Sequence, residues 1–151
     1  MKYIPEEDYK KILETMPVCC VDLIINKNNK VLLIKRNNEP EKGAFWIPGG
    51  RLLKGEKLKE AAIRLAKRET GINVKIEKLI GVYDYFSDKS RLPDLRTGTH
   101  NPSILFLVKP NQNKFEVTLD SDHSDHKWVG RIDRDLEPYI KKMLEDSGVF
   151  N

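Results

Sequence analysis

One carboxylate, Glu69, stands where the apolar face of a predicted helix should continue. Residues 57–70 have helical periodicity, and at about 100° per residue Leu58, Ala62, Leu65 and Glu69 fall within a narrow arc. An ionised carboxylate in a buried stripe needs a cation as its partner. In the alternative interpretation, Glu69 lies in the last helical turn near solvent, where a nearby Arg or Lys suffices. The helix alone does not decide between the two.

The segment before this helix favours the metal interpretation. Residues 45–47 (Phe-Trp-Ile) form an apolar run suited to a strand, residues 48–50 (Pro-Gly-Gly) allow a sharp turn, and Arg51 follows. A strand, a glycine turn and a helix bring backbone carbonyls, backbone N–H groups and a carboxylate together, which suits a divalent cation and a phosphate. An ordinary tight turn would also use Pro-Gly-Gly, so the turn by itself is not specific.

The spacing of polar and glycine residues over positions 50–72 resembles the Nudix box, the signature of hydrolases that act on nucleoside diphosphates linked to another group. The matching positions are Gly50, Glu56, Arg64, Glu69, Gly71 and Ile72. The box covers 23 of 151 residues and, with Trp-Ile-Pro-Gly-Gly before it, is far more specific than a lone glycine motif. The resemblance implies an α/β fold with a mixed β-sheet flanked by helices in an α/β/α sandwich, formed as one domain over residues 1–151.

Two positions of the box depart from the usual pattern. The usual box places three carboxylates on one helix face, whereas this chain has Leu65 and Arg68 at two of them and keeps only Glu69. Three glutamates can hold several Mg²⁺ ions around a pyrophosphate and activate water against phosphorus, whereas one glutamate suits a single ion. The sequence therefore favours a reaction other than attack on phosphorus.

The same departures resemble the altered box of GDP-mannose mannosyl hydrolases, which break the bond from sugar carbon to phosphate oxygen. Similar stretches follow in order along most of the chain, at residues 16–17, 21–24, 32–36, 81–83, 99–100 and 122–128. The resemblance implies Mg²⁺-dependent hydrolysis of a GDP-sugar at the anomeric carbon, with inversion, giving GDP and free sugar. Two alternatives stay open: a Nudix pyrophosphatase that cleaves the diphosphate of a nucleotide sugar or related compound, and a non-catalytic nucleotide-binding module.

The resemblance also implies a metal site and a general base. One Mg²⁺ or Mn²⁺ ion per subunit would be held by the Gly49 carbonyl, Glu69 and Asp122. The branch carries an amide at the position of Asp122, so the extra negative charge of the carboxylate would change metal affinity. His123 matches the general base, and a histidine, with a reference pKa of about 6.5, can accept a proton from water near neutral pH. Without the resemblance, His123 would be interpreted as a solvated loop residue. GDP leaves as an anion and needs no proton.

Three arginines complete the predicted catalytic set. A guanidinium donates paired hydrogen bonds to oxyanions and keeps its charge near neutrality. Arg36 and Arg51 match positions that hold the diphosphate in this branch. Arg64 either braces the box by pairing with Glu56 or stabilises charge at the leaving phosphate.

The predicted substrate-binding residues are Asp22, Arg36, Arg51, Tyr83 and His100. Asp22 interrupts an apolar run and matches a residue that contacts sugar or nucleotide; the alternative is an edge strand with Asp22 facing water. Tyr83 offers a ring for stacking, although core packing is the commoner role. After His100 the branch often has a tyrosine, and this chain has Asn101.

Composition is consistent with a single catalytic domain and a small-molecule substrate. The 27 basic and 23 acidic residues are interspersed, so the net charge of +4 fits a nucleotide sugar better than a nucleic acid polymer. No apolar run reaches the length of a membrane span and the first residues do not resemble a signal peptide, so we expect no membrane partner and a cytoplasmic location. Homodimers are common in this branch, and the N-terminal helix could serve such an interface; free thiols are expected at Cys19 and Cys20.

Periodicity and turn residues predict the order of the secondary structure elements. Helices are expected over residues 5–15, 57–70 and 135–145, and strands over 18–25, 31–35, 75–85, 103–108, 115–118 and 126–129. Residues 26–30 form a hairpin turn, Gly71 ends the second helix, and residues 86–99 form a loop that could act as a lid.

Overall fold

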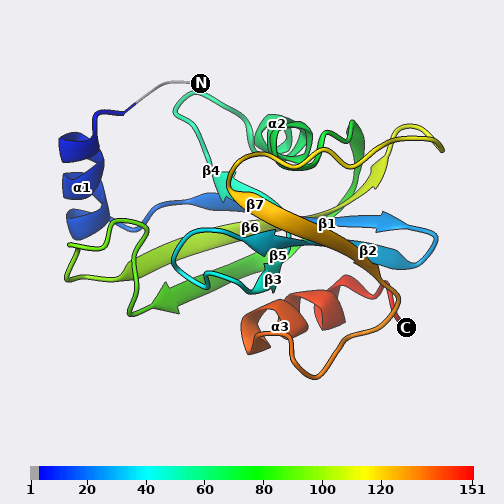
Figure 1. Cartoon of the computed structure of the whole chain (residues 1–151). Coiled ribbons are helices and arrows are strands. Elements are labelled where there is room, and N and C mark those ends of the chain that lie inside the picture. The colour runs from blue at the N-terminus through cyan, green and yellow to red at the C-terminus, as the bar shows by residue number, and fades with distance from the viewer. Residues whose placement is uncertain (1–3) are drawn as a thin grey trace.

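The computed structural model describes residues 4–151, which form three helices and seven strands (Figure 1). In chain order these are α1 (Glu6–Thr15), β1 (Cys20–Lys27), β2 (Lys30–Arg36), β3 (Phe45–Trp46), β4 (Gly49–Arg51), α2 (Leu58–Thr70), β5 (Val74–Ser87), β6 (Thr99–Pro110), β7 (His123–Val129) and α3 (Pro138–Ser147). The expected mixed sheet flanked by helices is confirmed. No helix among these residues is long and apolar enough to cross a membrane.

The sheet has the order β3-β2-β1-β6-β5, with β4 paired to β1 and β7 paired to β2. β1 runs parallel to β6, and the other pairs are antiparallel. Helix α2 covers one face of the sheet and α3 covers the other (Figure 1). Each face has its own apolar core, one containing Ala61, Ala62 and Leu65 of α2 and the other containing Ile140, Met143 and Leu144 of α3.

Local sequence signals fix the β1–β2 hairpin and the helix α2, which belongs to the predicted box. The β1–β2 hairpin turns through Asn28 and Asn29, both with positive φ (52° and 59°), the geometry that a two-residue hairpin loop requires. Helix α2 ends at Gly71, whose φ of 72° places it in the left-handed region that glycine tolerates best. The apolar stripe of α2 begins one turn later than expected, because Leu58 is 38% exposed while Ala62 and Leu65 are buried.

Several element predictions need correction, among them the start of β6, which is Thr99 instead of residue 103. Residues 115–118 are not a strand: Phe115 and Val117 pack against the α2 side of the core, but the Thr118 N–H donates to the Thr70 carbonyl instead of a neighbouring strand. Strand β7 begins at His123 instead of residue 126, because it continues pairing with β2 as far as Arg36. Helix α3 begins at Pro138, where the Glu137 carboxylate accepts the Tyr139 N–H at 2.6 Å and caps the first turn.

The loop predicted over residues 86–99 is slightly shorter in the structure. β5 extends to Ser87 and β6 begins at Thr99, so the connecting loop spans residues 88–98. The Lys10 ammonium of α1 contacts Asp94 of this loop at 2.6 Å. Cys19 and Cys20 are free thiols, as expected.

Leu65 should report on the docking of α2 to the sheet. Leu65→Ala removes a side chain that is 1% exposed, and we expect a loss of about 3 kcal/mol in the free energy of unfolding. The matched control is Ile63→Ala on the same helix, where the side chain is 44% exposed and the loss should be small. Urea unfolding measures both; equal losses would contradict this account of the packing.

Candidate active site

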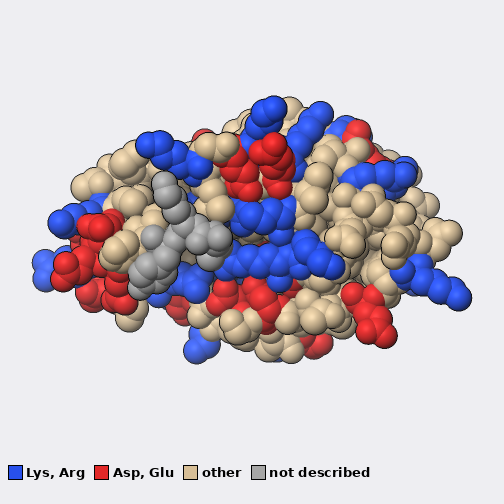
Figure 2. Space-filling model, turned by 90° about the horizontal axis from the view of Figure 1, so that it is seen from above, with Lys and Arg blue, Asp and Glu red and all other residues tan. Residues whose placement is uncertain are grey.

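A cavity of about 420 Å³ lies where β1, β4 and α2 meet the loops that follow β2 and β5. Among the described residues its charged lining includes Asp22, Arg36, Arg51, Arg64, Arg68, Glu69, Arg91, Asp122 and His123. Seen from above the view of Figure 1, Lys and Arg side chains form a band across the molecule with acidic side chains on both sides (Figure 2). Basic and acidic groups together suit an anionic ligand accompanied by a cation.

The Glu69 carboxylate is buried, as the helix pattern suggested. It is 7% exposed and accepts a hydrogen bond from the Gly49 N–H at 2.8 Å. Burial raises its pKa from 4.5 to about 8; the Gly49 hydrogen bond opposes the shift and the nearby Asp120 charge adds to it. Pairing of Asp22 with Gly49 in the β1–β4 ladder brings the glycine turn to the helix, and a Cβ at Gly49 would overlap the Asp22 carboxylate.

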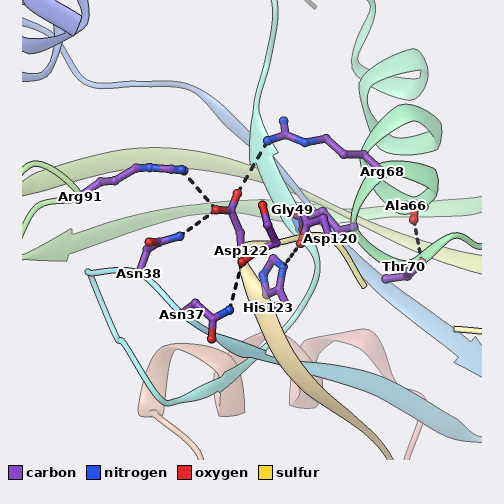
Figure 3. A network of polar contacts seen from close by, with 12 residues as sticks. Asn37, Asn38, Gly49, Ala66, Arg68, Thr70, Arg91, Asp120, Asp122 and His123 are labelled. Atoms are coloured by element: carbon purple, nitrogen blue, oxygen red, sulfur yellow. Dashed lines mark hydrogen bonds and ion pairs between the residues drawn. The ribbon is translucent and has the colours of Figure 1, made fainter. Parts of the chain in front are cut away.

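A second carboxylate and an imidazole lie beside Glu69. His123 Nδ1 donates to Asp120 Oδ1 at 2.6 Å (Figure 3), and one ligand atom each from Glu69, Asp120 and His123 lies within 4.8 Å of the others. The other oxygen of Asp120, Oδ2, is buried and has no hydrogen-bond partner. Two close carboxylates with an unpaired buried oxygen form a donor set that fits a divalent cation.

The Asp122 carboxylate points to a different set of partners. It accepts from Asn38 Nδ2 at 2.9 Å and Arg91 Nη2 at 3.3 Å, and lies 3.8 Å from Arg68 Nη2 (Figure 3). The backbone carbonyl of Asp122 accepts the Asn37 N–H at 2.9 Å. Asp122, predicted to bind the metal with Gly49 and Glu69, thus lies among cationic and amide donors.

The predicted arginines line the cavity with different internal partners. Arg64 contacts Glu56 through Nε (2.6 Å) and Nη2 (3.1 Å) and also donates to the Arg51 carbonyl, the bracing arrangement. Arg36 Nε donates to the Pro40 carbonyl at 2.8 Å. The Arg51 guanidinium lies 5.4 Å from the centre of the Tyr9 ring of α1.

Asp22 lies on a central strand, so the edge-strand alternative is wrong. It is on β1, between β2 and β6, lines the cavity and accepts the Ser103 hydroxyl. Burial raises its pKa from 3.8 to about 6, while the Ser103 hydrogen bond opposes that shift.

Tyr83 and His100 are not among the described residues that line the cavity. The Tyr83 hydroxyl donates to Asp146 of α3 at 2.7 Å. His100 stacks on Phe86 at 4.3 Å, with Nε2 3.6 Å from Asp84. The neighbours of His100 on β6, Thr99 and Asn101, line the cavity instead, because side chains alternate between the two faces of a strand.

Three residues at or beside the cavity escaped the sequence analysis: Asp120, which lies next to Glu69 and His123, and the lining residues Arg91 and Tyr139. Asp120 had a usable signal, because a carboxylate three residues before a histidine is within reach of its ring. Arg91 comes from a loop without periodicity, and Tyr139 comes from α3, far along the chain. Tyr139 stacks on Trp46 with ring centroids 5.9 Å apart. Only tertiary structure brings these last two residues to the cavity.

Comparison with known proteins identifies the class of protein to which this fold and site belong. The chain belongs to the NUDIX family, whose domain model matches residues 15–146. The "Low-salt glycan biosynthesis protein Agl8" of Haloferax volcanii is 32% identical over 142 residues, covering 94% of this chain and 89% of that protein.

Two further comparisons extend the resemblance. An "ADP-ribose pyrophosphatase" of Methanocaldococcus jannaschii is 44% identical over 108 residues, 71% of this chain and 60% of that protein. The solved structure of a MutT NUDIX hydrolase from Burkholderia pseudomallei shares the fold, with a TM-score of 0.71 and 24% identity over 87% of this chain and 98% of that chain. The chain is thus a Nudix hydrolase whose finer specificity has to be argued from its site.

The raised pKa of Glu69 predicts an unusual pH dependence of stability. The folded state binds this proton more tightly than the unfolded chain, so the stability it contributes is complete below the ordinary pKa of 4.5 and is lost as pH rises through about 8. In metal-free protein we expect the free energy of unfolding to fall by roughly 2 kcal/mol between about pH 6 and about pH 8.5. Urea unfolding in EDTA should show this fall, and Glu69→Gln should remove most of it. Parallel pH profiles for the two proteins would contradict the assignment.

Proposed function

We propose that this Nudix hydrolase cleaves a GDP-sugar of the GDP-mannose type at the anomeric carbon, with inversion, and releases GDP and the free sugar. The observation that carries the proposal is the hydrogen-bonded pair of buried His123 and half-buried Asp120 beside Glu69, the only glutamate kept at the three acidic box positions. The site thus combines a candidate base with a limited set of metal-ligating carboxylates.

One Mg²⁺ ion, or Mn²⁺ in its place, would be held by Glu69 and the Gly49 carbonyl. Asp120 is a further candidate ligand, because its Oδ2 is buried and has no hydrogen-bond partner. The predicted ligand Asp122 would have to leave Arg68 and Arg91 to reach the metal. When bound, the ion would neutralise charge on the departing diphosphate. Asp22, Tyr83 and His100 as sugar or nucleotide contacts, a homodimer and a cytoplasmic location stay predictions.

His123 serves as the general base in this proposal. The Asp120 carboxylate accepts from Nδ1–H, which fixes the tautomer that leaves Nε2 able to take a proton from water. As water oxygen bonds to the anomeric carbon, the bond from that carbon to phosphate oxygen breaks and its electron pair leaves with GDP. The proton stays on His123, and GDP departs as an anion.

Arginines stabilise the leaving diphosphate in this reaction. Arg36 and Arg51 line the cavity. Each guanidinium has five N–H donors, more than the contacts described above use. Arg64 braces the box through Glu56 while its side chain also lines the cavity. Charge-assisted hydrogen bonds from such groups strengthen as negative charge develops on phosphate oxygen.

The relatives support two substrate classes. The name of the Haloferax volcanii protein refers to glycan biosynthesis, which agrees with a sugar-linked substrate. The name of the Methanocaldococcus jannaschii relative supports the second candidate, a pyrophosphatase that cleaves the diphosphate of a nucleotide sugar or related compound. A non-catalytic nucleotide-binding module is the third.

Hydrolysis of GDP-mannose in ¹⁸O-labelled water distinguishes the three candidates. Attack on carbon places the label in the sugar, whereas attack on phosphorus places it in a phosphate. We expect labelled sugar and unlabelled GDP, measured by mass spectrometry. Label in phosphate would support the pyrophosphatase, and no turnover with any nucleotide sugar would support the binding module.

His123→Ala should separate proton transfer from metal binding. Loss of a general base lowers kcat by about 10² to 10⁴-fold. Because the carboxylates remain, Mn²⁺ affinity followed by electron paramagnetic resonance should change little. His126→Ala is the matched control, since His126 is exposed on the same strand. A large loss of Mn²⁺ affinity would instead make His123 a metal ligand, and unchanged kcat would exclude it as the base.

A further inference from the structure

Three segments far apart in the sequence converge on the Asp122 carboxylate. Asn38 comes from the loop after β2, Arg68 from the last turn of α2 and Arg91 from the loop over residues 88–98 (Figure 3). All three side chains line the cavity together with Asp122. None of the three is in the predicted catalytic or substrate-binding set.

Two guanidinium groups lie beside one carboxylate in this cluster. The Asp122 carboxylate is 3.3 Å from Arg91 Nη2 and 3.8 Å from Arg68 Nη2. The Arg68 and Arg91 side chains are 39% and 54% exposed, so both remain accessible from the cavity. A phosphate offers more acceptor oxygens and more negative charge than a carboxylate, and it matches the donor geometry of arginine.

Asn37 holds the backbone of the loop that carries Asp122. Asn37 N–H donates to the Asp122 carbonyl at 2.9 Å, and Asn37 Nδ2 donates to the Ser121 carbonyl at 3.1 Å. These contacts fix the loop without using the Asp122 side chain. The carboxylate can therefore be replaced by another anion while the loop backbone keeps its place.

We propose that Arg68, Arg91 and Asn38 form a phosphate-binding site of the substrate cavity, and that Asp122 is an internal anion which occupies it until a phosphate arrives. This inference rests on the proposed function only in assigning that phosphate to a nucleotide sugar. Arg68 and Arg91 would hold the diphosphate at the place that the Asp122 carboxylate occupies. Binding then exchanges the contacts of Asp122 for those of a phosphate oxygen.

The test uses metal-free protein in EDTA with inorganic pyrophosphate as the probe, measured by calorimetry at low salt. Arg68→Met and Arg91→Met should each weaken pyrophosphate binding by about tenfold, because a charge-assisted contact is lost. Asp122→Asn should strengthen binding several-fold, because the competing carboxylate is removed. Arg96→Met is the matched control, since Arg96 is exposed in the same loop and is not among the lining residues.

Each other outcome overturns the inference. If both arginine variants bind pyrophosphate like the unaltered protein, or if none of the proteins binds it, the arginines are not phosphate ligands. If Asp122→Asn binds no better, Asp122 is a brace for the arginines and not a competing anion; melting curves verify that each variant is folded. Pyrophosphate has neither base nor sugar, so failure here is distinct from failure of the proposed reaction, which the isotope experiment decides.

Discussion

The burial of the Glu69 carboxylate is the constraint on which the site depends. The last turn of α2 cannot pack against the sheet without enclosing this group, because Ala62 and Leu65 on the same face are fully within the core. The Gly49 N–H supplies one hydrogen bond, and only a glycine leaves room there for Asp22. One backbone donor does not offset the desolvation of a charged carboxylate, so its pKa rises. A cation bound here would stabilise the ionised form of Glu69 in the folded protein and would also act in the proposed reaction.

The parts of this arrangement that follow from local signals could be predicted from the sequence. The α2 stripe, its end at Gly71 and the hairpin through Asn28 and Asn29 depend on periodicity and on backbone positions with positive φ. The errors come from long-range pairing. Residues 115–118 alternate like a strand and partly bury apolar groups, but the Thr118 N–H bonds to the Thr70 carbonyl at the end of α2. β7 begins early because β2 offers partners up to Arg36. Pairing of this kind is decided by tertiary structure.

The same limit applies to individual site residues. Alternation along β6 sends His100 to one face and Thr99 and Asn101 to the other, but the sequence does not tell which face meets the cavity. Asp120 and Asp122 lie two residues apart in one loop and have opposite surroundings, one beside Glu69 and the other among arginines. A motif match locates the loop that carries His123, whereas the direction of each carboxylate depends on the segments around it.

Carboxylates and arginines meet at the cavity, and their charges bear on the proposed reaction. Glu69 and Asp120 lie beside His123 and form a donor set that suits a cation. Arg68 and Arg91 lie around Asp122 and add positive charge to the cavity lining, and Arg68 stands at a position where the Nudix box usually has a carboxylate. A diphosphate bound in this cavity would have much of its charge neutralised by side chains, so fewer metal ions would be needed. That distribution improves the diphosphate as a leaving group, and a good leaving group on the anomeric carbon is what attack on carbon requires.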